Sequence, residues 1–409
     1  MLWLLVLVLI GCTDNQEQAP LPGTLEATES YSVQLPQGGQ ISQRDGNRIL
    51  FLGSMIQRKS NQEATLFDAT TKKSLWHQQL PGSAIRAIIL PESDYILVTA
   101  KDKGNAHLVR LDGQTGKILW DRPFENEALD ALWLPEKDGL LVSDGFTLWL
   151  IDPDQGKILG TPGTALSKNA HPGSVILAQS IDDAQIIFLA SDNMLQQITL
   201  TGMKSTSQWQ FIAGKFITAL LPVHFANSQD GIILLAHSHS YFVSPAGKLL
   251  WHIKNQDINY APIAIPNAQS AQQVVFSNYV KGLYLVNAQG LQQHTPLPGG
   301  KVHILGIPMP IPQNILLGGA LITPSPYPSL QGYILSVRSL DNFFVYQLSP
   351  TGDLSLIAKT AIATEKKGGN IIQKGTLNPN YAPLQIKDAL GVTDGDGIHI
   401  FVLELQGEQ

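Results

Sequence analysis

Two histidines, His237 and His239, are the side chains in this sequence that are best spaced to bind a metal ion together. Residues two apart in an extended strand point to the same face, so both imidazoles could contact one transition metal. A site needs further ligands, and the nearest imidazoles in the sequence, His224 and His252, follow no pattern that brings them to the same point. We therefore interpret the stretch as the polar face of a strand and predict no metal site.

A second candidate is the stretch Asp394–Gly397, which alternates aspartate with glycine, like the first half of a calcium-binding loop. The acidic residue that closes such a loop is missing, so we interpret the stretch as a hairpin turn. The sequence also contains no Gly-x-Ser-x-Gly motif, no P-loop and no HExxH motif. It therefore predicts no catalytic residue and no bound cofactor.

Cys12 is the one cysteine among 409 residues, which excludes an internal disulfide. It follows Gly11 and the apolar run Leu2–Ile10, which is far shorter than the roughly 20 residues of a membrane-spanning helix. Although no lysine or arginine precedes this run, its length is typical of a secretory signal. We predict that residues 1–11 are a signal peptide.

The residues at this junction, Leu9, Ile10, Gly11 and Cys12, resemble the lipobox of bacterial lipoproteins. In that family the cysteine is acylated and becomes the first residue after cleavage, which implies a lipid on Cys12. An aspartate directly after the cysteine tends to hold such proteins at the inner membrane. This chain has Thr13 there, and the resemblance therefore implies the periplasmic face of the outer membrane.

The rest of the chain divides into a polar segment and a long apolar body. Residues 13–29 are polar, acidic and free of lysine and arginine, so we expect residues 12–29 to form a flexible lipidated tether. Residues 30–409 are expected to fold as one domain. The chain is 44% hydrophobic with a net charge of −6 and has no long basic run, which argues against nucleic-acid binding.

A phrase of the type Asp-x-x-Thr-Gly-Lys-x-x-Trp recurs along this body. Its most complete copies end at Trp76 and Trp120, and altered copies end at Gly160, Trp209 and Trp251. The spacing of about 45 residues is typical of a four-stranded propeller blade. The position of the turn glycine falls at Lys72, Gly116, Gly156, Gly202, Gly247, Gly290 and Gly352.

Each residue type in the phrase has a structural role. The aspartate and threonine can bond turn amides, the glycine can adopt a positive φ, and the tryptophan can fill the space between neighbouring sheets. We therefore assign structural roles in the repeat to Asp68, Trp76, Asp112, Thr115, Gly116, Trp120, Asp152, Gly156, Gly247 and Trp251.

The two ends of the chain complement each other. Residues 31–36 (YSVQLP) align without gaps on residues 76–81 (WHQQLP), so the folded part begins at the tryptophan-bearing strand of a blade. Residues 394–405 read as a hairpin with no such strand after it. We predict that Tyr31–Leu35 completes the last blade. With seven turn motifs, this gives an all-β, eight-bladed β-propeller of four-stranded antiparallel blades, with seven blades as the alternative.

The interval between Gly290 and Gly352 is longer than the others and contains a proline-rich stretch near residues 306–330. Proline cannot donate to a central ladder. We therefore expect an insertion here, as a long loop or an edge decoration on one face of the propeller, which is a candidate contact surface.

The repeat resembles the family of eight-bladed quinoprotein-like propellers. That family includes pyrroloquinoline-quinone dehydrogenases, but these are typically longer and use acidic residues and a calcium ion. With a predicted lipid anchor and degenerate propeller repeats, this chain resembles the scaffold lipoproteins of the outer-membrane β-barrel assembly machinery. This implies a non-enzymatic monomer within an envelope protein complex. A scaffold of a secretion or pilus complex and a quinone-dependent oxidoreductase stay open as alternatives.

Overall fold

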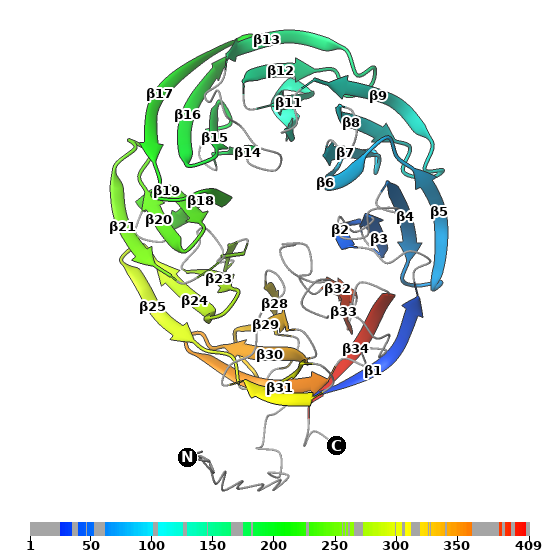
Figure 1. Cartoon of the computed structure of the whole chain (residues 1–409), viewed down its shortest axis with the longest axis vertical. Helices are drawn as coiled ribbons and strands as arrows, with labels where there is room; N and C mark the ends of the chain where they lie inside the picture. Colours follow the sequence, from blue (N-terminus) through cyan, green and yellow to red (C-terminus); the bar gives the residue numbers. More distant parts are fainter. Residues whose placement is uncertain are drawn as a thin grey trace, which may run out of the picture.

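The chain forms a closed ring of eight four-stranded antiparallel sheets, in a computed structural model (Figure 1). The ring confirms the eight-bladed propeller predicted from the repeat. The structure describes residues 25–34, 40–45, 47–52, 62–100, 105–125, 129–144, 146–164, 175–180, 183–225, 229–255, 257, 259–260, 262–265, 273–298, 300–304, 307–311, 320–325, 327, 329–339, 342–361, 384–386, 389–393 and 397–405.

Seven blades take their strands in chain order from the centre of the ring to the rim, and blade 8 takes β32, β33 and β34 followed by β1. Blade 1 contains β2 (Gln40–Asp45), β3 (Arg48–Leu52), β4 (Glu63–Asp68) and β5 (Lys73–Gln79). Blade 2 contains β6 (Ser83–Ile89), β7 (Tyr95–Ala100), β8 (Ala106–Leu111) and β9 (Ile118–Phe124). Blade 3 contains β10 (Asp130–Leu134), a 3-10 turn (Pro135–Lys137), β11 (Gly139–Ser143), β12 (Thr147–Ile151) and β13 (Ile158–Thr164). Blade 4 contains β14 (Val175–Gln179), β15 (Ile186–Ser191), β16 (Met194–Thr201) and β17 (Lys204–Ile212).

The second half of the ring follows the same order. Blade 5 contains β18 (Ile217–Phe225), β19 (Gln229–Ala236), β20 (His239–Val243) and β21 (Leu249–Lys254). Blade 6 contains β22 (Ile263–Ala264), β23 (Val274–Asn278), β24 (Gly282–Asn287) and β25 (Gly290–Thr295). Blade 7 contains β28 (Leu321–Pro324), β29 (Tyr333–Arg338), β30 (Asn342–Leu348) and β31 (Leu354–Ala361). Blade 8 contains β32 (Leu384–Ile386), β33 (Ala389–Thr393), β34 (Gly397–Leu405) and β1 (Leu25–Gln34).

Strand sequence follows the position in the blade. The second strands β11 (GLLVS) and β23 (VVFSN) are buried at every residue, because neighbouring blades cover both of their faces. The outermost strand β17 (KSTSQWQFI) instead contains exposed and half-buried residues and none that is fully buried. The apolar core consequently lies between blades: one cluster joins Leu50 and Leu66 of blade 1 to Leu97 and Val109 of blade 2.

Strand β1 closes the ring by pairing antiparallel with β34, with Ser32 opposite His399. This is the predicted completion of the last blade by the N-terminal strand. The strand begins at Leu25, however, and not near Tyr31. Residues 25–29 of the segment expected to be a tether are therefore part of the sheet, because they continue to find partners along β34.

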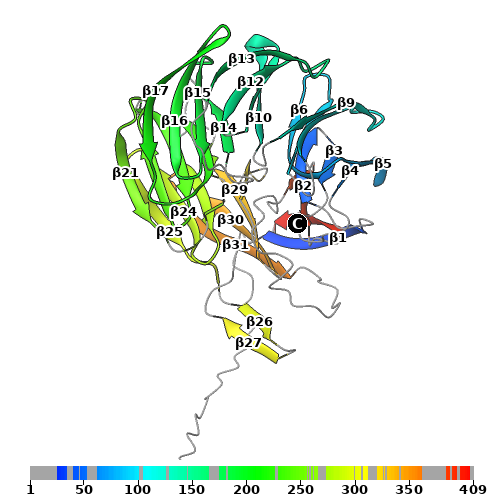
Figure 2. The same cartoon turned by 45° about the horizontal axis from the view of Figure 1, so that its top comes forward.

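The proline-rich stretch divides into two parts. A hairpin of β26 (Gly300–Ile304) and β27 (Ile307–Ile311) projects from the ring (Figure 2). Residues 321–324 form β28, the innermost strand of blade 7, so the stretch 306–330 is not all insertion. Both parts tolerate proline because β27 and β28 are edge strands, which have one side free of ladder hydrogen bonds.

Candidate functional site

The repeated aspartates hold the turns that precede the outermost strands. In blade 2, Oδ1 of Asp112 accepts hydrogen bonds from the backbone N–H groups of Gln114 (3.0 Å) and Thr115 (2.6 Å) and from the Thr115 hydroxyl (2.8 Å). The bonds from Thr115 lower the pKa of the Asp112 carboxyl below its ordinary value. Asp68 and Asp152 accept equivalent bonds from the turn amides of blades 1 and 3.

The turn position aligned with Gly116 has a positive φ in all seven copies. Six copies have glycine there, and the first has a lysine at φ 57°. These residues are Lys72, Gly116, Gly156, Gly202, Gly247, Gly290 and Gly352. Because L side chains rarely adopt this conformation, the recurrence of glycine follows from the turn geometry.

The tryptophan of one blade lies on the turn of the next. Trp76 covers Gly116 and Trp120 covers Gly156: a Cβ added to these glycines would lie 2.5 and 2.8 Å from the indole ring. The Trp76 Nε1–H also donates to the carbonyl of Gly113 (3.2 Å). Each tryptophan thus fixes its neighbour by packing and by a hydrogen bond.

The same contact continues into the second half of the ring. Trp209 lies on Gly247 and donates to the carbonyl of Pro245 (2.7 Å). Trp251 lies near Gly290 and donates to the carbonyl of Asn287 (3.1 Å). The repeat residues therefore join blades, and their polar groups are occupied in doing so.

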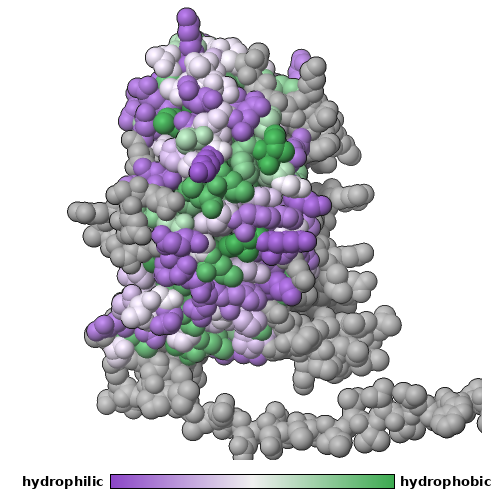
Figure 3. Space-filling model, turned by 90° about the vertical axis from the view of Figure 1, so that its left-hand side faces the viewer, coloured by the Kyte–Doolittle hydropathy of each residue, from purple (hydrophilic) through white to green (hydrophobic). Residues whose placement is uncertain are grey.

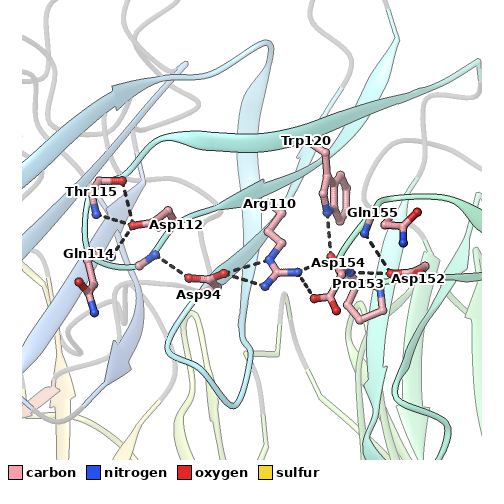
Figure 4. A network of polar contacts seen from close by, with 11 residues as sticks. Asp94, Arg110, Asp112, Gln114, Thr115, Trp120, Asp152, Pro153, Asp154 and Gln155 are labelled. Carbon is pink, nitrogen blue, oxygen red and sulfur yellow. Dashed lines mark hydrogen bonds and ion pairs between the residues drawn. The ribbon is translucent and has the colours of Figure 1, made fainter.

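Arg110 adds a second contact between blades 2 and 3 (Figure 4). Its buried guanidinium donates to Asp94 within its own blade (3.0 Å from Nε) and to Asp154 (2.5 Å) and the Pro153 carbonyl (2.8 Å) in the next turn. The Nε1–H of Trp120 donates to the same Pro153 carbonyl (2.8 Å). Two carboxylates thus compensate the buried charge, which makes this network structural.

Two blade junctions replace the tryptophan with other contacts. In blade 3 the tryptophan position is Gly160, and Met203 of blade 4 fills the space: a Cβ on Gly160 would lie 1.8 Å from the Met203 Cε. Between blades 6 and 7, the side-chain amide of Gln293 donates to the Leu354 carbonyl (3.3 Å) and accepts from the Leu354 N–H (3.0 Å). Each device preserves contact between outer strands.

Two of the four candidate metal-binding histidines come together, and the other two are not grouped with them. His237 is exposed in the turn before β20, whereas the His239 ring stacks on His252 of β21 with centroids 5.0 Å apart. Tyr241 extends the stack at 4.7 Å from His252. Burial, together with His239 and Lys254, lowers the pKa of His252.

His224, in contrast, pairs with Asp230 of the adjacent strand. Within the part of the chain that the structure describes, no three histidine, cysteine, aspartate or glutamate side chains are grouped to hold a metal. The described residues therefore include no acidic cluster of the kind that a calcium-dependent quinone site requires. Cys12 and residues 394–396 lie outside the described residues. Over the described ranges, the structure contains no helix long and apolar enough to span a membrane.

The remaining candidate for function is the rim. Among the strands that the structure describes, each of the eight outermost ones has one backbone edge that pairs with no other described strand: β1, β5, β9, β13, β17, β21, β25 and β31. An unpaired edge offers N–H and C=O groups to another strand. The rim therefore suits protein binding better than chemistry on a small molecule.

Sequence reasoning missed Arg110, the Met203–Gly160 pair and the Gln293–Leu354 pair. The sequence does give a signal for the Met203–Gly160 pair, because Gly160 occupies the tryptophan position of the repeat and Met203 directly follows the next turn glycine. Arg110 gives no comparable signal, since its partners in the sequence are 16 and 44 residues away.

Comparison with known proteins agrees with this architecture. No curated protein matches this chain in sequence. The crystal structure of BamB from Moraxella catarrhalis is similar in fold, with a TM-score of 0.54 at 13% identity over 92% of this chain and 100% of that one. A family model described as "Outer membrane protein assembly factor BamB" matches residues 60–287, more than half of the sequence. The chain therefore belongs to the family of the outer membrane protein assembly factor BamB.

Proposed function

We propose that this chain is a non-catalytic scaffold lipoprotein of outer-membrane protein assembly. It binds the periplasmic domains of the central barrel protein of the β-barrel assembly machinery and acts there as a single copy. The lipid on Cys12 holds it at the periplasmic face of the outer membrane.

The proposal rests on one observation: the polar repeat residues form hydrogen bonds within the ring. The turn aspartates, the indole N–H groups and Arg110 all bond to backbone or side chains of the ring. They stabilise a rigid ring and leave the rim edges and the loops of both faces for protein contacts. Such contacts rest on main-chain groups and shape, so they need no catalytic set. The family match supports the same conclusion.

The test is affinity purification of the lipidated chain from gently solubilised envelopes, with mass spectrometry of the proteins recovered. The proposal predicts recovery of the central barrel protein of the assembly machinery. A Trp120→Ala variant, in which the ring is loosened, is the control. It should recover less of the barrel protein if the binding needs the folded propeller. Recovery of a secretion or pilus complex in its place would contradict the proposed partner, and a copurifying quinone absorbance would contradict the non-catalytic role.

A further inference from the structure

The outermost strands differ in how well their open edges are protected. Natural sheets protect an edge with proline, glycine, charge or short length, each of which hinders the addition of another strand. Strand β9 (ILWDRPF) carries Pro123 and two charged residues, and β13 (ILGTPGT) carries Pro162 between two glycines. Strands β21 and β25 have six residues each.

Strand β17 has none of these protections beyond its first residue. It spans nine residues, and after Lys204 the sequence STSQWQFI contains no charge, proline or glycine. Strand β5 (KSLWHQQ) also has a lysine only at its start, but it is shorter, with seven residues. Strand β31 has a lysine at position 359 and lies beside β1, while β1 carries two glutamates. A register shift does not distinguish the outermost strands, because the ladder of each one, including β17 at Gln208, contains at least one. A long and neutral edge is the kind to which further strands add.

The two faces of β17 define the strand that would fit beside it. Trp209 and Phe211 are half-buried on one face, where Phe211 packs against the ring of Tyr241 with centroids 5.6 Å apart. Gln210 is exposed on the other face, and the pairing of β17 with β16 is regular from Trp209 to Ile212, after the register shift at Gln208. A strand paired with β17 continues both faces, so its residues must alternate between apolar and polar.

The surface beside the edge also favours an apolar contact. Ile212, the last residue of β17, is 61% exposed, and Phe216 just beyond it is 40% exposed. Figure 3 views the rim from the side of β17, β21 and β25, and shows apolar patches among the polar surface. Contiguous exposed apolar surface marks interaction sites on soluble domains.

We infer that the open edge of β17 accepts an extended protein segment of alternating apolar and polar residues as a fifth strand of blade 4. This pattern is that of a strand of a membrane β-barrel before it folds. The inference rests on the proposed function, because a scaffold of barrel assembly meets such segments. The contact is made by main-chain hydrogen bonds and does not need one particular sequence.

The direct test measures binding of the fluorescent peptide KVTVQYTVQVK to the full chain carrying Cys12→Ser, by anisotropy. Two further peptides carry N-methyl groups on alternate residues, one on the odd-numbered and one on the even-numbered positions. Each of them therefore lacks the backbone N–H donors along one of its two edges. We expect saturable binding of the parent peptide and slower amide hydrogen exchange along β17. At least one methylated peptide should bind about tenfold more weakly or worse.

Proline variants locate the site. Adjacent residues of a strand point their N–H groups to opposite sides. Of the two variants Thr206→Pro and Ser207→Pro, one therefore loses an N–H group that bonds β16, and the other loses only an N–H group at the open edge. The variant that keeps the melting midpoint of the parent should lose peptide binding about tenfold or more. The matched control comes from β5, where His77→Pro and Gln78→Pro form an equivalent pair. The variant of this pair that keeps the melting midpoint of the parent should bind the peptide normally.

Several outcomes would overturn the inference. They are no binding of the parent peptide, equal binding of all three peptides, equal loss in the β5 control, or a dimer of the chain that the β17 proline abolishes. Failure of the proposed function gives a different result: the barrel protein would be missing from the affinity purification while peptide binding to β17 persists.

Discussion

The contacts between blades depend on a few side chains, of which Trp120 is the most heavily used. Its ring lies on Gly156 and its Nε1–H bonds the Pro153 carbonyl, which also accepts from Arg110. Trp120→Ala should lower the free energy of unfolding by about 3–5 kcal/mol in urea titrations, because it leaves a cavity beside Gly156 and removes one of the two hydrogen bonds to the Pro153 carbonyl. Leu119→Ala is the control: its side chain is 49% exposed, so the change should stay within about 0.5 kcal/mol. Similar losses for both variants would contradict the assigned role.

Gly160 and Met203 form a compensating pair, which a double-mutant cycle can measure. Gly160→Trp alone should destabilise by about 1–3 kcal/mol, since the Met203 methyl occupies the space. Adding Met203→Ala should recover about 1 kcal/mol or more, because it restores room for the tryptophan of the repeat. Additive effects of the two changes would show that the residues do not share this space.

The stacked His252 predicts a pH dependence of stability. Its pKa in the folded state is lowered from 6.5, so the unfolded chain binds the proton first as the pH falls. The stability that neutral His252 contributes is therefore present above pH 6.5 and is lost as the pH falls toward the lower folded value. His252→Gln should reduce the drop in melting midpoint between about pH 7.5 and 5.5. His237→Gln, in the exposed turn, is the control and should leave that drop unchanged.

At the scale of elements, the ring depends on β1, which supplies the outermost strand of blade 8. Deleting residues 25–34 should remove the partner of β34 and lower the melting midpoint, because an entire ladder is lost. Deleting residues 13–24 should leave the midpoint unchanged. Equal effects of the two deletions would contradict closure by a shared strand.

Elements that repeat could be predicted from the sequence, and those that depart from the repeat could not. The period, the turn glycines and the alignment of residues 31–36 on 76–81 together indicated eight blades and their closure. The start of β1 at Leu25 escaped this reasoning, because acidic residues suit a tether as well as an edge strand. The hairpin β26–β27 and strand β28 escaped because proline argues against a central strand but not against an edge.

The same limit applies to the candidate site. Positions such as Asp112 and Trp120 recur, so the spacing indicated their structural roles. The open edge of β17 is defined by what its sequence lacks relative to the other outer strands. That comparison requires knowledge of which strands are outermost, and the structure supplies it.

For the whole molecule, the proposed lipid anchor makes a prediction about location. Cys12→Ser should release the chain from outer-membrane fractions into the soluble periplasmic fraction, since the lipid is its proposed attachment. Immunoblots of fractionated cells provide the measurement. A serine variant that still sediments with outer membranes would show that another feature anchors the chain.

The ring as a whole is proposed to be a scaffold for the barrel-assembly machinery. The most direct measurement is biolayer interferometry between the purified Cys12→Ser chain and the isolated periplasmic domains of the central barrel protein from the same bacterium. We expect saturable binding with a dissociation constant of about 10 μM or tighter, and weaker binding by Trp120→Ala, which loosens the ring. Absence of binding by the folded chain, with its melting midpoint intact, would contradict the claim.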